Sequence, residues 1–414
     1  MSTDQALLPR IGTAAVPAER IGSAVRFEVL DSWRGICALL VALFHFPAAS
    51  FVSQSSFIAS SYLFVDFFFV LSGFVIAASY AGKLRGWDDG LRFAAIRLGR
   101  VYPLHVVMLA AFALFELVRL VLPQLRGAGG APFSDPYDAG SLVANLLLVH
   151  GLGLYDHLTW NGPSWSISSE FFTYLAFAAV VIPLAGRAWI VLAAVAIAAP
   201  ATLYLSGARN MDLSYDWGFV RCAAGFSLGA LIAHFQHGAI VAARRRPGDA
   251  TDRAFWTVAE IAMVVAIVSF VAGTGDKPAS IAAPFVFALA IYLFAHEGGA
   301  VSTLLRRPLF LWLGALSYSI YMVHTFVQGR LYNVFALLDR KLGLGIVGEV
   351  VHHGKATVGF GPDSQAVALA AAAVMLAAVV AVAWLTWRFV EMPALAWTKR
   401  TVAGIAPRKA AVAT

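Results

Sequence analysis

The chain has 414 residues, of which 60% are hydrophobic and only 13% are charged. Soluble domains carry about a quarter charged residues, so this composition excludes a soluble globular protein and indicates an integral membrane protein with many spans. The net charge of +7 does not indicate nucleic-acid binding, because the basic residues are scattered among the predicted loops. Cys37 and Cys222 lie in apolar segments without disulfide or metal-ligand spacing, and we expect no metal site.

A bilayer-spanning helix needs about 20 apolar residues. Ten runs near this length follow in chain order: 33–53, 60–81, 96–122, 164–184, 187–206, 217–237, 255–273, 279–297, 309–336 and 365–391. We therefore predict an all-α fold, a polytopic helical bundle with about ten transmembrane helices over residues 30–395. Residues 1–29 and 396–414 are predicted to be cytoplasmic tails.

A shorter apolar run, 141–153, leaves the topology open. Basic residues are enriched in cytoplasmic loops. If this run does not cross, the arginine cluster 244–246 is cytoplasmic, and if it does cross, that cluster lies outside. We therefore predict that the run does not cross, that both termini are cytoplasmic, and that 141–163 is a re-entrant or surface element on the outer side. The loop 338–364 also faces outward in this topology.

The first predicted span contains two polar residues that are costly in a membrane. His45 follows a long apolar run, and an ionisable residue inside a span usually faces a protein interior or a water-filled cavity. Arg34 lies eleven positions earlier. At about 100° per residue both side chains share one helix face, about 16 Å apart along the axis. A permanent cation and a buried base on one face indicate catalysis.

The second predicted span contains Asp66, whose insertion near a span centre costs on the order of 2.5–3.5 kcal/mol. Spans one and two form a hairpin that turns near residues 55–56, so His45 and Asp66 are expected at similar depth. A carboxylate that accepts a hydrogen bond from one imidazole nitrogen leaves the other nitrogen free as a base. We predict that Asp66 orients His45. The alternative is that Asp66 caps a helix or faces outer water.

The third predicted span opens with Arg97 and Arg100, which share a helix face because they are three positions apart. Together with Arg34 they form a cationic cluster at the cytoplasmic end, which suits the phosphates of an anionic cofactor. Arginines that merely extend to the inner membrane interface are equally compatible with the spacing.

Later spans add further polar residues. Trp165 suits an interfacial aromatic belt, and Glu170 lies inside the fourth span and needs a partner. Tyr321 and His324 share one face of the ninth span. Single polar residues often serve as packing contacts between helices. Packing alone does not readily explain five such residues spread over four spans, so we treat them together as candidate site residues: Arg34, His45, Asp66, Glu170 and His324.

The tenth predicted span ends with Arg388 and Glu391, and we predict that these two side chains pair with each other because they are three positions apart. This pair would then be structural, and neither residue is counted among the candidate site residues.

Six ordered motifs resemble those of the membrane-bound acyltransferase family 3. They lie at residues 30–38 with His45 beyond, 68–74, 97–103, 165–170, 313–324 and 391–393. The resemblance therefore extends over nearly the whole chain. Ser32, Val101 and Met392 depart from the usual residues of these motifs, and none of them is a proposed catalytic group.

The resemblance implies a membrane O-acetyltransferase that acts on bacterial cell-surface or exported carbohydrates, such as exopolysaccharide or lipopolysaccharide. The implied donor substrate is acetyl-coenzyme A or another acyl-coenzyme A, and the implied location is the bacterial cytoplasmic (inner) membrane. Family members need an arginine and a histidine that correspond to Arg34 and His45. The expected partners are the acyl-coenzyme A donor, a carbohydrate acceptor that is free or lipid-linked, and the bilayer, but no nucleic acid.

The expected mechanism uses these residues in separate roles. The donor phosphates dock on Arg34, Arg97 and Arg100, and the pantetheine arm follows a polar channel to His45, the general base. Direct transfer and an acyl-histidine intermediate are both compatible with the sequence. The candidate oxyanion donors, which the sequence does not rank, are Ser72, Tyr321 and His324.

Two alternative functions use the same polar residues. A transporter or flippase for a glycan or a lipid-linked sugar would use them as a conduit, but the sequence shows no clear internal repeat of the kind many transporters have. A proton-coupled transporter would use His45 and Asp66 as a relay, and this leaves the cytoplasmic arginine cluster without a role.

Overall fold

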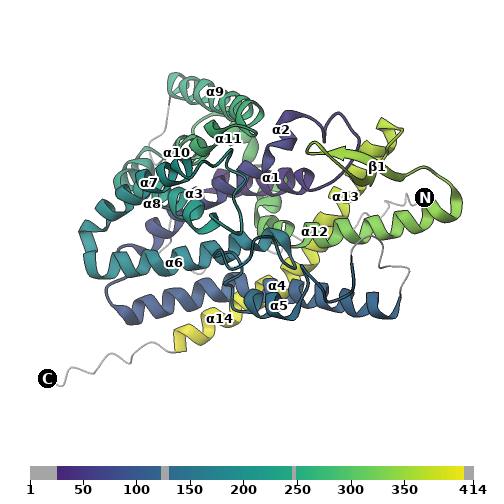
Figure 1. Cartoon of the computed structure of the whole chain (residues 1–414). Coiled ribbons are helices and arrows are strands. Elements are labelled where there is room, and N and C mark those ends of the chain that lie inside the picture. Colours follow the sequence, from purple (N-terminus) through teal and green to yellow (C-terminus); the bar gives the residue numbers. More distant parts are fainter. Residues whose placement is uncertain (1–25, 123–129, 245–248, 405–414) are drawn as a thin grey trace, which may run out of the picture.

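The computed structural model describes residues 26–122, 130–244 and 249–404. Several long helices run along a common direction, and α4 lies beside both α6 and α12 (Figure 1). One helix corresponds to each of the ten predicted apolar runs: α1 Glu28–Phe44, α3 Phe64–Tyr80, α4 Trp87–Val121, α6 Trp165–Leu184, α7 Ala188–Leu205, α8 Gly218–Arg244, α9 Ala250–Thr274, α10 Ala283–Phe294, α12 Pro308–Leu342 and α13 Gln365–Thr386.

Shorter elements connect these helices. They are α2 Ser56–Ala59, α5 Ala139–Leu146, α11 Ala300–Leu305, α14 Met392–Gly404, several single 3₁₀ turns, and a π-helical segment, Trp387–Glu391. A two-stranded antiparallel sheet, β1 Val347–His352 and β2 Lys355–Phe360, follows α12. The predicted all-helical membrane bundle is therefore confirmed, with one hairpin that the sequence analysis did not predict.

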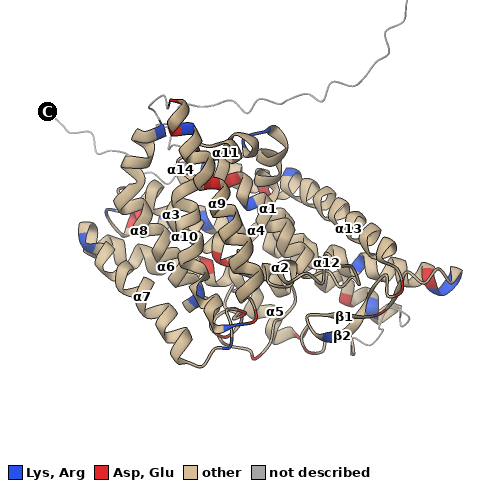
Figure 2. Cartoon of the chain, turned by 90° about the horizontal axis from the view of Figure 1, so that it is seen from above, with Lys and Arg blue, Asp and Glu red and all other residues tan. Residues whose placement is uncertain are grey.

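Seven helices of the described chain are long and apolar enough to cross a membrane. One of these comprises α6 and α7, which are joined by a single 3₁₀ turn. Helix α1, with 17 residues, and the segment Pro278–Phe294 are shorter. Charged residues are sparse along the bundle (Figure 2). The protein is thus a polytopic helical membrane protein, while ten crossings and two cytoplasmic termini stay predictions.

The ambiguous run 141–153 forms only α5 and a following turn. An eight-residue helix rises about 12 Å, much less than the hydrocarbon core of about 30 Å, so α5 by itself is too short to cross the membrane. Asp138 caps its N-terminus, because one carboxylate oxygen accepts hydrogen bonds from the N–H groups of Gly140 and Ser141. The place of this segment at the outer surface of the membrane stays a prediction.

Helix α1 ends earlier than predicted. The predicted span continued to residue 53, but the helix stops at Phe44 and His45 is its C-cap. The reason is Pro47, which has no N–H to donate to the helix and restricts the residue before it. His45 therefore lies at the end of the helix rather than in the middle of a span.

One end of the bundle is held together by a carboxylate. Glu297 accepts hydrogen bonds from Arg244 at 2.7 Å and from the Val29 N–H at 3.2 Å, and Arg306 lies 3.5 Å away. These contacts bring the start of α1, the end of α8 and the start of α12 to the same end, as the predicted topology requires. Residues 1–25 of the predicted N-terminal tail, Arg245, Arg246 and residues 405–414 lie outside the described residues, and α14 extends into the predicted tail 396–414.

Helices α1 and α12 approach each other at a pair of glycines. A Cβ atom on Gly35 would lie 2.6 Å from the backbone carbonyl carbon of Leu313, and one on Gly314 would lie 2.3 Å from the Asp31 carbonyl oxygen. Small residues let two helix backbones approach this closely. The contact fixes the side chains that α1 and α12 contribute to the interior relative to each other.

We predict that Gly314→Ala lowers the midpoint of thermal unfolding of the purified protein, because the added methyl group forces α1 and α12 apart. Overpacking of this kind costs about 1–3 kcal/mol. The matched control is Gly329→Ala on the same helix, where the added Cβ meets no atom within 4 Å and the midpoint should hold or rise. Equal midpoints for the two variants would contradict the role of the glycine contact.

Candidate active site

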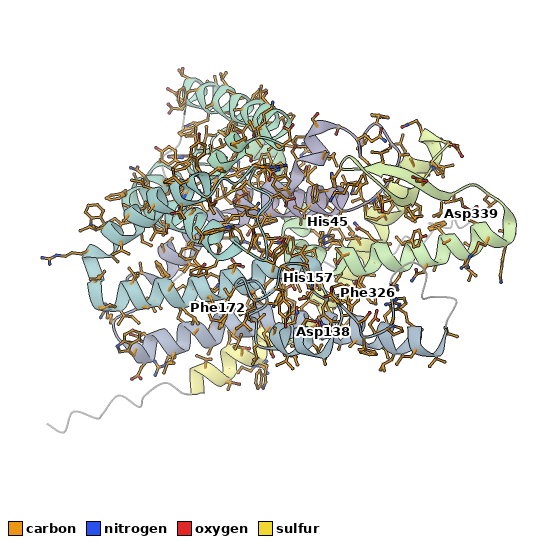
Figure 3. All side chains as sticks on the ribbon, viewed as in Figure 1. His45, Asp138, His157, Phe172, Phe326 and Asp339 are labelled. Atoms are coloured by element: carbon orange, nitrogen blue, oxygen red, sulfur yellow. The ribbon has the colours of Figure 1, made fainter. Side chains whose placement is uncertain are left out.

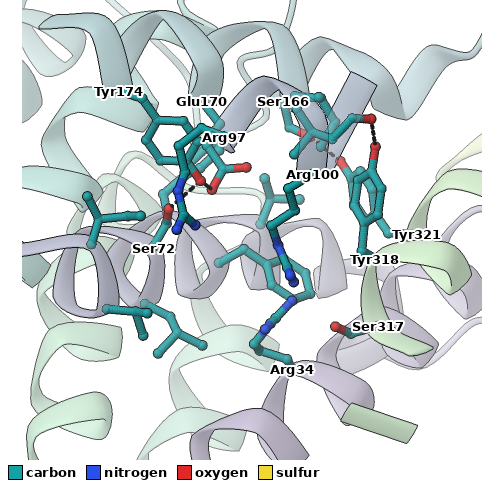
Figure 4. A pocket seen from close by; sticks show the side chains of 18 residues that line it. Arg34, Ser72, Arg97, Arg100, Ser166, Glu170, Tyr174, Ser317, Tyr318 and Tyr321 are labelled. Carbon is teal, nitrogen blue, oxygen red and sulfur yellow. Dashed lines mark hydrogen bonds between the residues drawn. The ribbon is translucent and has the colours of Figure 1, made fainter. Parts of the chain in front are cut away.

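A cavity of about 260 Å³ lies between α1, α3, α4, α6 and α12 (Figure 4). Its wall is lined by residues of these five helices, which are distant from one another in the sequence. Six of the ten predicted site residues are among them: Arg34, Ser72, Arg97, Arg100, Glu170 and Tyr321. The structure therefore brings most of the predicted residues into one site.

Three guanidinium groups give this cavity an excess of positive charge. The guanidinium groups of Arg34 and Arg100 point toward each other (Figure 4). Arg34 has one weak ionic contact, 3.5 Å to Asp31, and Arg100 donates no hydrogen bond to any described residue. Arg97 donates to the Tyr80 hydroxyl at 2.9 Å. Like charges held together at low dielectric favour an anion between them, so this wall suits a phosphate-bearing ligand.

Glu170 has a partner in its own helix. The Tyr174 hydroxyl donates to Glu170 at 2.5 Å and also lies 2.9 Å from the Ser72 hydroxyl. Since the single hydroxyl hydrogen of Tyr174 is given to Glu170, Ser72 must donate to Tyr174. Ser72 thus has no free hydrogen for an oxyanion in this arrangement.

Glu391 does not pair with Arg388, contrary to the prediction. It is buried, accepts a hydrogen bond from Ser319 at 3.0 Å, and lies near enough to Arg34 and Arg100 to interact electrostatically with both, while Arg388 is exposed. The π-helical segment Trp387–Glu391 adds a residue to one turn and so rotates Glu391 toward the bundle interior. Glu391 does not line the cavity, but it lies close to two of its arginines, and the sequence analysis missed this position.

His45 contacts a second histidine. Its Nδ1 atom lies 2.9 Å from the Val41 carbonyl oxygen and 3.3 Å from Nε2 of His324, and His324 Nδ1 lies 2.7 Å from the Tyr321 carbonyl oxygen. Carbonyl oxygens only accept, so both Nδ1 atoms carry hydrogen, and His324 Nε2 is an acceptor. Nε2 of His45 then carries a free lone pair. The His45 ring is partly exposed at the end of α1 (Figure 3).

The predicted pairing of His45 with Asp66 is wrong. Both carboxylate oxygens of Asp66 accept hydrogen bonds from Arg221, at 2.7 and 3.0 Å, and both side chains are almost fully buried. Two further Arg221 hydrogens go to the carbonyl groups of Leu213 and Tyr62. A bidentate guanidinium satisfies a buried carboxylate better than a neutral imidazole does. Arg221 was detectable in the sequence as a charged residue inside the sixth apolar run.

Trp165 does not belong to an interfacial belt. Its side chain is 6% exposed and packs against Phe69 and the Arg221 guanidinium, with the guanidinium carbon 5.5 Å from the ring centroid. It therefore supports the Asp66–Arg221 pair rather than lining the cavity.

The cavity does not reach His45. Tyr321 is the last lining residue on that side, and its ring lies between Phe68 and His324, with centroid distances of 6.0 and 5.8 Å. The Tyr321 hydroxyl is held by the Ser166 hydroxyl and the Pro163 carbonyl group, both at 2.9 Å. The expected open channel from the arginines to His45 is thus interrupted by Tyr321, and His324 lies between that ring and His45.

A family model described as an acyltransferase domain matches residues 27–388. This chain belongs to acyltransferase family 3. This acyltransferase is 36% identical over 166 residues to a Rhizobium radiobacter protein named protein 2 in picA locus, which covers 37% of the chain and 81% of that protein. It is 32% identical over 165 residues to acyltransferase MdmB of Streptomyces mycarofaciens, which covers 37% of the chain but only 38% of MdmB.

No solved structure matches this acyltransferase. The family and the multi-pass fold together establish a membrane acyltransferase, with an acyl donor and an acceptor as substrates. Within the described residues, no group of three or more histidine, cysteine, aspartate or glutamate side chains is placed to hold a metal ion.

We predict that Asp66→Asn lowers the stability of this acyltransferase by about 3–5 kcal/mol, because it leaves the Arg221 charge buried without a counter-ion. The double variant Asp66→Leu with Arg221→Met should lose less, since it removes both charges. Thermal unfolding of the purified proteins measures the difference. A fully stable Asp66→Asn variant with reduced turnover would contradict this structural role.

Proposed function

We propose that this acyltransferase moves an acetyl group from acetyl-coenzyme A to a hydroxyl group of a cell-surface or exported carbohydrate, with His45 as general base. The observation that carries the proposal is the arginine-lined cavity, whose far wall, Tyr321, touches His324, the partner of His45. Two neighbouring side chains, Tyr321 and His324, thus separate the arginine cavity from His45. We place the protein in the bacterial cytoplasmic membrane, with both termini in the cytoplasm.

The donor phosphates bind Arg34, Arg97 and Arg100, the three cations of the cavity wall. Arginine suits this role because its planar fork donates two hydrogen bonds to a phosphate. The acetyl thioester then passes Tyr321, whose hydroxyl must leave Ser166 for the path to open. The cavity is thereby closed to the acceptor side until a donor is bound.

Transfer itself is an acyl substitution. Nε2 of His45 takes the proton from the acceptor hydroxyl as that oxygen attacks the thioester carbonyl carbon. The C–O bond forms, the C–S bond breaks, and the His45 imidazolium returns the proton to the leaving thiolate. Proton transfer by a positioned side chain typically contributes roughly 10²–10⁴-fold to the rate. His324 holds the reactive lone pair in place, because it accepts from the opposite ring nitrogen.

The function is tested with purified protein, radiolabelled acetyl-coenzyme A and the glycan fraction from the envelope of a deletion strain. We expect label in the glycan, and His45→Ala should lower the transfer rate by about 10²–10⁴-fold. The matched control is His234→Ala, a histidine on α8 that contacts no residue of the site. Full transfer by His45→Ala would rule out the base, and movement of glycan across vesicles without label would favour a transporter.

We predict that His324→Leu lowers kcat by about 10–100-fold, because the loss of one buried hydrogen-bond partner costs about 1–3 kcal/mol. The KM for acetyl-coenzyme A should not change, since His324 does not line the cavity. His324→Gln keeps an acceptor near Nδ1 of His45 and should restore part of kcat. If leucine and glutamine variants lose kcat equally, the role of His324 is packing rather than orientation.

A further inference from the structure

We infer that the β1–β2 hairpin forms the acceptor side of the site and that His353, in its turn, is a specificity-determining residue that contacts a neutral, hydroxyl-bearing acceptor. This inference rests on the proposed function, because it assigns the acceptor of that same reaction to a surface. No residue of the hairpin belongs to the six motifs, and none lines the arginine cavity.

The base of the hairpin is fixed to the segment that follows His45. The Phe360 N–H donates to the Pro47 carbonyl oxygen, and the Ala49 N–H donates to the Phe360 carbonyl oxygen, both at 2.9 Å. The rings of Phe46 and Phe360 stack with centroids 4.9 Å apart. A Cβ atom on Gly359 would lie 2.3 Å from the Pro47 oxygen, so only glycine fits at this contact. The hairpin and the end of α1 therefore form one unit.

The other side of the hairpin base is fixed to α12. Asp339, near the outer end of that helix, accepts a hydrogen bond from the Val347 N–H at 2.9 Å (Figure 3). Tyr332 and Phe335 of the same helix place their rings 6.4 and 5.8 Å from the Phe360 ring. The hairpin thus bridges α1 and α12, the two helices that carry His45 and His324.

The tip of the hairpin reaches the residue next to His45. His353 and Gly354 have positive φ angles of 50° and 74°, as in the two-residue turns that connect antiparallel strands. His353 Nε2 lies 2.9 Å from the Phe44 carbonyl oxygen, and the two rings are 4.3 Å apart. The Phe44 ring in turn lies 4.8 Å from the His45 ring. A molecule that approaches His45 from this end meets the hairpin tip.

The two imidazole rings of the tip offer hydrogen-bond acceptors, and the fixed charge beside them belongs to the exposed Lys355. Because His353 Nε2 donates to a carbonyl group, its Nδ1 atom carries a lone pair that faces no described donor. The His352 ring lies 3.8 Å from the His353 ring. Burial, with His353 and His45 close by, lowers the pKa of His352 to about 4, so this ring is uncharged at neutral pH. A hydroxyl donor fits these two rings better than a phosphate or a carboxylate does, and the charge of Lys355 is tested separately below.

The test uses His353→Asn, because Asn-Gly is among the most favourable pairs for this turn and tolerates the positive φ angle. The imidazole is removed while the hairpin is kept. With the purified full chain, radiolabelled acetyl-coenzyme A and the envelope glycan fraction of a deletion strain, we expect the KM for the glycan to rise about tenfold. The KM for acetyl-coenzyme A should stay unchanged.

The matched control is Lys355→Ala, an exposed residue that pairs with His352 in the sheet and contacts no part of α1. Its KM for the glycan should equal that of the wild type. The glycan is also separated by anion exchange, and the label should enter the neutral fraction.

Three outcomes overturn the inference. An unchanged glycan KM in His353→Asn would make the hairpin purely structural. A glycan KM that rises in Lys355→Ala, or label that enters only the acidic fraction, would make the acceptor anionic. The proposed function fails separately, if the wild-type protein itself transfers no label to glycan.

Discussion

The close approach of α1 and α12 is the constraint on which the site depends. Gly35 follows Arg34 directly, and Gly314 lies on the helix that carries Tyr321 and His324. Because neither glycine has a side chain, the two backbones touch there. The arginine of the cavity, the aromatic barrier and both histidines thereby hold fixed positions relative to one another. A larger residue at either position would separate the groups that must act together.

Buried charges in this bundle are of two kinds, and their partners distinguish them. Both oxygens of Asp66 accept hydrogen bonds from Arg221, and Arg221 also donates to two backbone carbonyl groups, so this buried ion pair is well satisfied within the protein. Arg34 and Arg100 instead face each other without a full complement of acceptors, although Glu391 and Glu170 are nearby. The first pair is complete without a ligand, whereas the second leaves hydrogen-bond donors for an anion. Unused hydrogen-bond donors therefore distinguish the candidate binding site from the structural ion pair.

Much of the fold was predictable because apolar run length is a direct consequence of bilayer thickness, and each of the ten runs became a helix. The cavity residues on a single helix face, such as Arg97 and Arg100, were predictable for the same geometric reason. Contacts between different helices were not predictable, because the spacing of residues in the sequence does not indicate which helices pack against each other. The partner of Asp66 lies 155 positions away, and the partner of His45 lies 279 positions away. Pro47 could have predicted the end of α1, but the apolar residues that follow it made the predicted span too long.

If the donor is the proposed thioester, the same arrangement also protects it from hydrolysis. Water that reaches His45 from the hairpin side meets Tyr321 before the arginine cavity, and the hydroxyl of that tyrosine is held by Ser166 and Pro163. Opening this barrier costs two hydrogen bonds, each worth about 0.5–1.5 kcal/mol, together with the packing of the ring on Phe68. That cost is small enough for a bound donor to offset through its own contacts, which in the proposed donor are those of the pantetheine arm. Without a donor, no new contacts offset the cost of moving Tyr321. In the proposed reaction, the two substrates therefore meet only when the donor is bound.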